Sequence, residues 1–214
     1  MSNIIFDVGL HKTGSSSRQH FFKKYLTKKG FDVILNSFDM KTHINLDKKT
    51  IVSAEGLSGM SHSPFEKFEN RIEIIWKLSR CYPDAKIILV LRDKQDWMKS
   101  AFNQYSYSCF AFSWKNFWLQ YDKRLLDWEL YINYLKSLFK EVYVCNFEQL
   151  KSNPYLFYKG MCDFIGVDMP LDFKNIKRNI KKPTYKIIVL QYIDFIFKSK
   201  RLHTVISHFI KRIN

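Results

Sequence analysis

Residues 3–19 read NIIFDVGLHKTGSSSRQ, and this stretch decides the fold. Its first part, Ile4–Val8, is short, β-branched and aromatic, and predicts a buried strand that ends at Gly9. A turn that contains Lys12 follows, and Ser17–Leu26 has helical character. A strand, a tight turn and a helix leave unpaired backbone N–H groups at the helix start, where an anion can bind. The stretch therefore predicts an anion-binding loop.

The spacing of the loop glycines invites comparison with the phosphate-binding loop of nucleoside triphosphatases, G-x-x-x-x-G-K-[ST]. Gly9 and Gly14 have that spacing, but Ser15 stands where the lysine of that loop belongs. The lysine of this chain lies inside the loop, at Lys12. This difference disfavours an ordinary ATPase or kinase. Taken alone, the loop could also be a glycine turn with a surface lysine.

The pattern G-x-x-K-T-G-[ST]-[ST] instead resembles the 5′-phosphosulfate loop of sulfotransferases that use 3′-phosphoadenosine 5′-phosphosulfate (PAPS). The resemblance implies an α/β fold in three layers, a parallel sheet flanked by helices, related to nucleoside monophosphate kinases. It also implies that Lys12 stabilises the leaving group. The cofactor contacts that it implies in this loop are Gly9, Lys12, Thr13, Gly14, Ser15 and Ser16.

A second motif lies at the end of the strongest predicted strand, Ala85–Leu91. Arg92 follows that strand, and Ser100 lies eight residues further on, as in the 3′-phosphate motif of the same sulfotransferases. An arginine at a strand end can bind a phosphate with two donors, and a serine on the following helix can reach the same group. Two residues depart from the family pattern: Lys94 replaces a common proline, and Trp97 replaces a frequent basic residue. Taken alone, Arg92 could equally pair with a carboxylate.

Later elements extend the resemblance over roughly residues 3–180. The family's strand and turn resemble residues 142–150, VYVCNFEQL, in which we interpret Phe147 and Leu150 as packing residues. Arg178 and Asn179 resemble a late element that closes over the nucleotide in some members. We expect both to contact the cofactor.

The candidate base is Glu55, which follows a predicted strand, Thr50–Ala54. Sulfuryl transfer requires the acceptor hydroxyl or amine to lose a proton, and a carboxylate at a neighbouring strand end can accept it. Carbohydrate sulfotransferases that resemble this chain place a glutamate after this strand. The alternative for Glu55 is a structural role in capping or ion pairing. His11 is the competing catalytic candidate.

Composition narrows the class of protein. The 214 residues carry a formal net charge of +15, which suits polyanionic partners such as nucleotides, acidic glycans, nucleic acid or an anionic membrane. The four cysteines lack C-x-x-C pairing, so we expect reduced thiols, no metal and a cytoplasmic location. The chain enters a predicted strand by residue 4, so we expect neither a signal peptide nor an N-terminal anchor.

The remaining predicted elements alternate between strands and helices, which indicates a parallel sheet with its ligands at the strand C-terminal ends. Aromatic residues are dense between them, and Trp114, Trp118, Tyr105 and Tyr107 could stack on a sugar or belong to the core. The predicted strands are Phe31–Ser37, Thr50–Ala54, Ala85–Leu91 and Glu141–Asn146, and the predicted helices are Ser63–Cys81, Trp97–Tyr105, a segment around 125–135 and one from Pro154 to Ile165.

We divide the chain into a sulfotransferase domain, residues 1–180, and a basic amphipathic helical extension of it, residues 181–214. From Lys174 to Asn214 there are eleven Lys and Arg residues against one carboxylate, Asp194. Apolar residues of this segment recur at helical spacing. We expect 185–214 to contact an anionic membrane or an acidic partner, and packing on the domain core is the alternative.

The resemblance, taken with the composition, implies a cytoplasmic, membrane-associated or free, bacterial sulfotransferase that acts on a glycan or glycolipid, with PAPS as cofactor and no metal. The bacterial origin is inferred from heavy use of Lys, Ile, Asn, Phe and Tyr. A nucleotide-binding kinase and a basic nucleic-acid-binding module are the alternative functions. The first lacks its lysine at Ser15, and the second lacks a recognisable motif, so we expect no nucleic-acid partner.

Overall fold

The computed structural model describes residues 3–36, 44–59, 63–109 and 113–174, without the side chains of 107–109. Its centre is a five-stranded parallel sheet in the order β2–β3–β1–β4–β5. The elements in chain order are β1 (Ile4–Asp7), α1 (Ser15–Phe21), η1 (Phe22–Leu26), η2 (Thr27–Lys29), β2 (Asp32–Leu35), β3 (Thr50–Ser53), η3 (Glu55–Ser58), α2 (Phe68–Cys81), β4 (Lys86–Leu91), α3 (Lys94–Cys109), α4 (Trp114–Gln120), η4 (Lys123–Leu126), α5 (Trp128–Leu138), β5 (Glu141–Asn146), α6 (Phe147–Ser152) and α7 (Pro154–Ile165).

The strand order places β1 in the middle of the sheet. It pairs with β3 on one side, where Ile5 faces Ile51, and with β4 on the other, where Phe6 faces Ile87. All four residues of β1 are buried, as expected for a parallel strand covered on both faces. Because parallel strands end at one edge, the segments that follow β1, β3 and β4 meet there.

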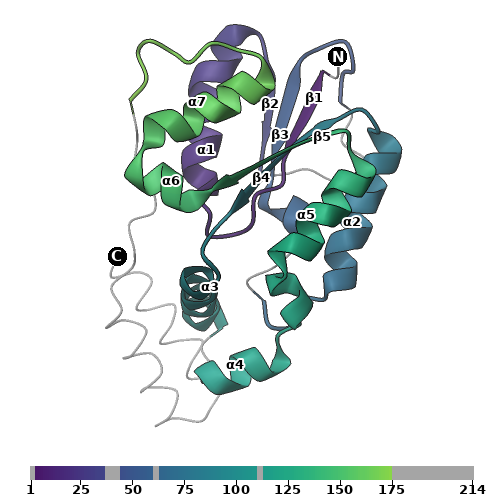
Figure 1. The fold of residues 1–214 in the computed structure, drawn as a ribbon, viewed down its shortest axis with the longest axis vertical. Helices are drawn as coiled ribbons and strands as arrows, with labels where there is room; N and C mark the ends of the chain where they lie inside the picture. The colour runs from purple at the N-terminus through teal and green to yellow at the C-terminus, as the bar shows by residue number, and fades with distance from the viewer. Residues whose placement is uncertain (1–2, 37–43, 60–62, 110–112, 175–214) are drawn as a thin grey trace.

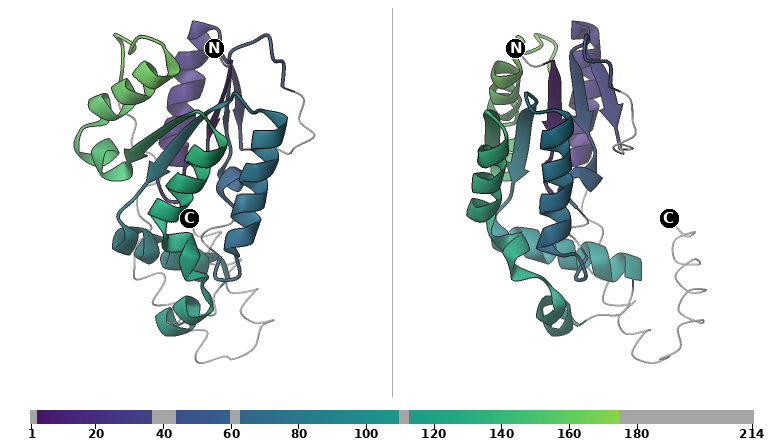
Figure 2. Two further views of the ribbon diagram at one scale, coloured as in Figure 1. Left: turned by 45° about the vertical axis from the view of Figure 1, so that its right-hand side comes forward. Right: turned by 90° about the vertical axis from the view of Figure 1, so that its right-hand side faces the viewer.

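Helices cover both faces of the sheet. Figures 1 and 2 show α1, α6 and α7 on one face and α2 and α5 on the other. The first face buries Phe21 and Phe157 against the strands, and the second buries Ile75 and Leu135. The predicted three-layer α/β fold with a parallel sheet is confirmed.

A third apolar cluster lies beyond the carboxyl ends of the strands, where Figure 1 shows α3 and α4. Trp97, Phe117 and Leu125 are fully buried there, and Tyr105 is nearly so. Tyr105 therefore belongs to the core. Trp114 remains 44% exposed, and Tyr107 lies outside the described side chains.

The starts of three predicted helices differ from expectation. The first helix begins earlier, at Ser15, and changes to a π-helical turn at Phe22. The second helix begins at Phe68 rather than Ser63, where the Phe68 N–H donates to the side chain of Asp122 (3.0 Å). The third begins three residues before Trp97, because the Asp93 carboxylate caps it by accepting from the Asp96 N–H (2.9 Å).

The proposed extension, residues 181–214, lies outside the described residues, so its helices and its membrane contact stay predictions. Within the described ranges, no helix is both long and apolar enough to span a bilayer.

Candidate active site

The loop after β1 keeps a defined shape. Val8 and Leu10 continue the ladder by donating to the carbonyls of Ile88 (2.9 Å) and Val90 (3.4 Å). Lys12 then adopts a φ of 65°, in the left-handed region that side chains with a Cβ avoid at a cost of about 1–3 kcal/mol. Such backbone strain persists only where surrounding contacts impose it, and it is concentrated at functional sites.

Gly14 closes the loop and starts α1, with a φ of 81°. A Cβ at this position would lie 2.8 Å from Leu150 Cδ2 and 2.9 Å from Phe147 Cε2. Glycine is required twice, by the backbone angle and by the close approach of α6. Phe147 and Leu150 are thus packing residues, as interpreted from the sequence, and they pack on the loop itself.

Three contacts hold the loop against the segment that follows β4. The Lys12 ammonium donates to Gln104 Oε1 (3.1 Å), Arg92 Nη1 donates to the Lys12 carbonyl (3.1 Å) and the Trp97 indole donates to the His11 carbonyl (2.8 Å). Trp97, where the family often has a basic residue, is fully buried. Its indole N–H gives this departure from the family pattern a structural role.

Arg92 lies where the sequence predicted a phosphate contact. Its side chain is 10% exposed, and burial lowers its pKa from the ordinary 12.5. The guanidinium carbon lies 5.1 Å from the centre of the Phe147 ring, a cation–π distance. Its Nε is buried and has no hydrogen-bond partner among the described residues. The Lys12 carbonyl therefore holds Arg92 Nη1, whereas Nε donates to no described residue.

Glu55 begins the turn after β3 and contacts the loop directly. One carboxylate oxygen accepts from the Ser15 hydroxyl, and the other lies 3.3 Å from His11 Nε2. The Glu55 side chain is 43% exposed, whereas His11 is 11% exposed. The two candidate bases, which the sequence places 44 residues apart, are thus in contact with each other.

The turn that carries Glu55 is fixed from behind. The Ser58 hydroxyl donates to the Glu55 carbonyl (3.1 Å) and lies 3.4 Å from the Gly9 carbonyl. Arg71 of α2, fully buried, donates from Nε to the Ser58 carbonyl (3.2 Å). The turn and the loop therefore form one connected unit.

The predicted cofactor residues take different places in this unit. Thr13 is fully buried and its hydroxyl donates to the Leu10 carbonyl, so its side chain shapes the loop. Ser16 is half-buried at the start of α1, and Ser100 is half-buried on α3. Arg178 and Asn179 lie outside the described residues, and their cofactor contacts stay predictions.

The described ranges contain no group of three or more His, Cys, Asp or Glu side chains that could hold a metal ion. The donors that meet at this edge of the sheet are cations, hydroxyls and amides, which bind anions. Chemically, the arrangement combines a loop that carries a cation, Lys12, with a carboxylate, Glu55, beside it.

A sequence model of the sulfotransferase domain matches residues 4–156. The chain belongs to the sulfotransferase family. The predicted family is confirmed, and with it the class of enzyme, a transferase. Among curated proteins, no sequence matches this sulfotransferase.

Two solved structures are similar to this sulfotransferase. A sulfotransferase from Alicyclobacillus acidocaldarius matches at a TM-score of 0.56 and 16% identity, over 91% of this chain and 92% of that chain. Mouse sulfotransferase SULT7A1, complexed with PAP, matches at a TM-score of 0.49 and 17% identity, over 78% of this chain and 60% of that chain. The first likeness is one of fold.

Sequence reasoning missed two residues beneath the loop of this sulfotransferase. Asp7, at the end of β1, and Arg18, on α1, are almost fully buried, and Arg18 Nε lies 3.0 Å from the Asp7 carboxylate. Arg18 also donates to the Thr13 carbonyl (2.6 Å), and Asp7 accepts from the Gly9 N–H (3.2 Å). A carboxylate inside an apolar strand was the available signal.

The contact between this ion pair and the loop explains the glycine at position 9. A Cβ on Gly9 would lie 2.2 Å from Arg18 Nη2, so any other residue would displace the guanidinium. Glycine is therefore required at the two loop positions for different reasons. At Gly14 the backbone angle and the approach of α6 require it, and at Gly9 the buried guanidinium of Arg18 does.

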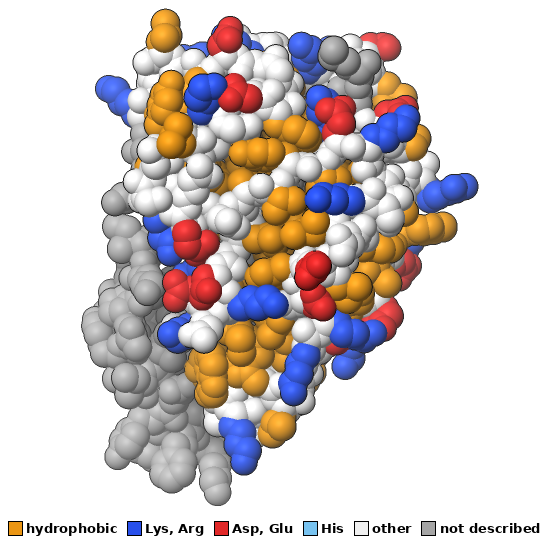
Figure 3. All heavy atoms as spheres, viewed as in Figure 1, with side chains coloured by type: hydrophobic (Ala, Val, Ile, Leu, Met, Phe, Trp, Pro, Cys, Tyr) orange, Lys and Arg blue, Asp and Glu red, His pale blue; other side chains and the backbone are white. Residues whose placement is uncertain are grey.

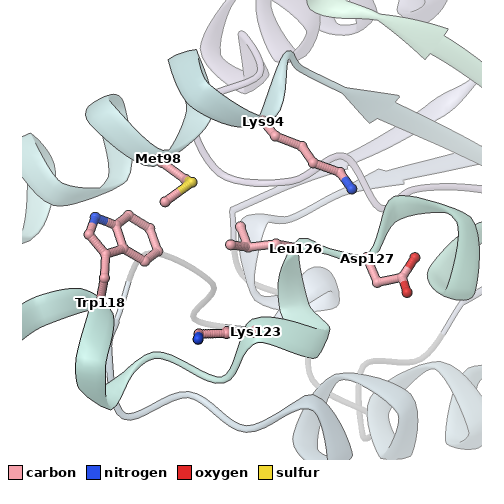
Figure 4. Close-up of a pocket in the computed structure, with 6 residues that line it drawn as sticks. All are labelled: Lys94, Met98, Trp118, Lys123, Leu126 and Asp127. Atoms are coloured by element: carbon pink, nitrogen blue, oxygen red, sulfur yellow. The ribbon is translucent and has the colours of Figure 1, made fainter.

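An open pocket of about 470 Å³ lies beside α3. Figure 4 shows Trp118 and Met98 on one side of it and Lys94 and Asp127 on the other. Lys94 and Met98 project from a flank of α3 different from that of Gln104, which contacts Lys12. On the face that Figure 3 shows, hydrophobic side chains form a band between charges of both signs.

Proposed function

We propose that this sulfotransferase transfers the sulfuryl group of PAPS to a hydroxyl or amine of a glycan or glycolipid. The observation that carries the proposal is the meeting of three segments at one edge of the sheet. Lys12 is bonded to the segment that carries Arg92, and Glu55 contacts the same loop through His11. An anion held by the loop would therefore lie between cations on one side and a carboxylate on the other.

The residues present fit the cofactor. Lys12, the cation of the loop, has a φ of 65°, and such strained backbone is concentrated at functional sites. A guanidinium at a strand end, as at Arg92, is suited to a phosphate oxygen. When bound, PAPS would supply the activated sulfuryl group, and adenosine 3′,5′-bisphosphate (PAP) would be the leaving product.

The roles of the protein groups follow from charge. Lys12 stabilises the negative charge that develops on the leaving phosphate oxygen, as cations do in phosphoryl transfer. Glu55 accepts the proton of the attacking hydroxyl or amine as the new bond to sulfur forms. His11, beside it, orients the carboxylate. Ser15 donates to the same carboxylate, which leaves the exposed edge of Glu55 for the acceptor.

The acceptor class rests on the resemblance to carbohydrate sulfotransferases, which place a glutamate after the strand where this chain has Glu55. A labelled-PAPS screen against glycan and glycolipid acceptors tests this part. A cytoplasmic, bacterial setting and contact with an anionic membrane through 185–214 remain our expectations.

The test of the donor is calorimetry with PAP together with turnover of PAPS. Lys12→Ala should lower turnover more than PAP affinity, because the charge acts on the leaving group. Arg92→Ala and Ser100→Ala should mainly weaken PAP binding.

Lys159→Ala is the control, since Lys159 is exposed on α7 and its ammonium pairs with Asp163 of the same helix. Retention of wild-type PAP affinity by Arg92→Ala would contradict the 3′-phosphate assignment. Transfer of phosphate from labelled ATP, without transfer from PAPS, would favour the kinase alternative.

A further inference from the structure

One row of α3 side chains faces the loop. Asp96, Ser100 and Gln104 follow each other at intervals of four residues, so they lie along one side of the helix. Gln104 contacts Lys12, which fixes the direction of this row. Asp96 therefore lies one helical turn before Ser100, on the side of the proposed nucleotide site.

The Asp96 carboxylate lies between two cations from different elements. Its Oδ2 is 3.9 Å from Arg92 Nη2 and 3.8 Å from Lys151 Nζ of α6. Arg92 and Lys151 also share an aromatic support, since each cation lies 5.1 Å from the centre of the Phe147 ring. The two cations and the ring thus form a site with an anion already in it.

The carboxylate is held loosely. Both distances exceed the range of a hydrogen bond, and the side chains of Asp96 and Lys151 are 48% and 47% exposed. The start of α3 does not depend on it, because Asp93 supplies the cap. Glu148 gives Lys151 a second carboxylate at 3.6 Å, so removing Asp96 would not leave Lys151 unpaired.

We propose that Lys151 binds the 3′-phosphate of the nucleotide together with Arg92 and Ser100, and that Asp96 occupies the space between the two cations until the phosphate replaces it. This inference rests on the proposed function, because it needs a 3′-phosphorylated nucleotide. A phosphate carries more negative charge than a carboxylate and offers three acceptor oxygens, so it satisfies two cations better. An exposed ion pair is weak, and its displacement costs little.

The experiment compares two nucleotides that differ only in the 3′-phosphate, PAP and adenosine 5′-monophosphate. Calorimetry of the full chain should give about 10- to 100-fold weaker PAP binding for Lys151→Ala, the range of one charge-assisted contact. Binding of the monophosphate should not change. Lys151→Arg should keep most of the PAP affinity, because it keeps the charge.

Asp96→Asn should change the affinity for PAP in the opposite direction. Removing the resident anion should tighten PAP binding about two- to five-fold, the range of an exposed ion pair. Lys159→Ala is the matched control, because it removes the same charge from a side chain that is 46% exposed on the neighbouring helix. It should leave the affinities for both nucleotides unchanged.

Each possible result either supports the proposed role of Lys151 and Asp96 or contradicts it. Equal weakening of both nucleotides by Lys151→Ala would show a general charge effect and overturn the assignment, and unchanged PAP binding would overturn it too. If Asp96→Asn leaves PAP binding unchanged or weakens it, the proposal that the phosphate replaces Asp96 is wrong. If wild-type protein binds the two nucleotides equally, or neither, the proposed function itself fails, and this inference falls with it.

Discussion

The two sides of the loop carry opposite kinds of ion pair. Beneath the loop, Asp7 and Arg18 are almost fully buried, and both are hydrogen-bonded to the loop, Arg18 to the Thr13 carbonyl and Asp7 to the Gly9 N–H. On the solvent side, Asp96 and Lys151 are half exposed and lie beyond hydrogen-bond distance of each other. Both pairs join a carboxylate to a cation, but the first pair is buried and the second is half exposed.

Depth changes what the pair can do. A buried charge that loses its partner is left without water, so the pair beneath the loop must stay intact for the fold to be stable. An exposed charge regains water when its partner leaves, so the pair above the loop can give way to a ligand. We infer that the underside maintains the loop and that the solvent side, which includes Glu55, serves binding and reaction.

The largest expected effect on the solvent side is loss of turnover without loss of stability. Glu55→Gln should lower turnover about 10²- to 10⁴-fold, the usual contribution of a general base, and should bind PAP normally. Its urea midpoint should stay close to that of wild type, since Glu55 is 43% exposed.

His11→Gln sharpens this test, because it should perturb PAP binding as well as rate. If Glu55→Gln turns over the true acceptor near the wild-type rate, Glu55 is structural and His11 becomes the candidate base.

Breaking the pair beneath the loop should act mainly on stability. Arg18→Met should lower the free energy of unfolding by about 3–5 kcal/mol, because it leaves the Asp7 carboxylate buried without its cation. Urea denaturation measures this change. Arg124→Met is the control: it makes the same substitution at a side chain that is 52% exposed, and should cost much less.

A second variant keeps this prediction testable if Arg18→Met does not fold. Asp7→Asn with Arg18→Met removes both charges and should recover part of the loss. Equal urea midpoints for Arg18→Met and Arg124→Met would remove the difference in depth on which the comparison rests.

The smallest expected effect concerns acid stability, at an ion pair far along the chain from the loop. Hydrogen bonds from Arg124, and then from the Phe68 and Arg124 N–H groups, lower the pKa of Asp122 from 3.8 to about 2. A carboxylate with a lowered pKa stabilises the fold above its unfolded pKa and loses that contribution as the pH falls through the folded one. Stability should therefore fall between about pH 4 and pH 2.

Thermal unfolding between pH 2 and pH 7 measures this contribution. Asp122→Asn should be slightly less stable than wild type at neutral pH, and the difference should shrink as the pH falls toward 2. A difference that stays constant over this range would assign the effect to packing rather than to ionisation.

Local patterns in the sequence predicted much of the fold. The strands at Thr50–Ser53 and Glu141–Asn146 agree with expectation to within one residue, because β-branched and aromatic runs bounded by turns are local signals. The start of α2 was missed, because it depends on a contact between Phe68 and Asp122, 54 residues away. No pattern around Ser63 contains that information.

By itself, the sequence determined that a strand, a turn and a helix follow one another near the start of the chain, and that a lysine and hydroxyls lie in or beside the turn. These are local signals, because β-branched residues favour a strand and glycines permit a turn. The left-handed backbone of Lys12, by contrast, persists only because surrounding contacts impose it. Only the tertiary structure decided that His11 meets Glu55, that Asp7 and Arg18 are buried beneath the loop, and that Lys151 shares Phe147 with Arg92. Those contacts depend on strand order and helix packing, which bring together residues that no local pattern connects.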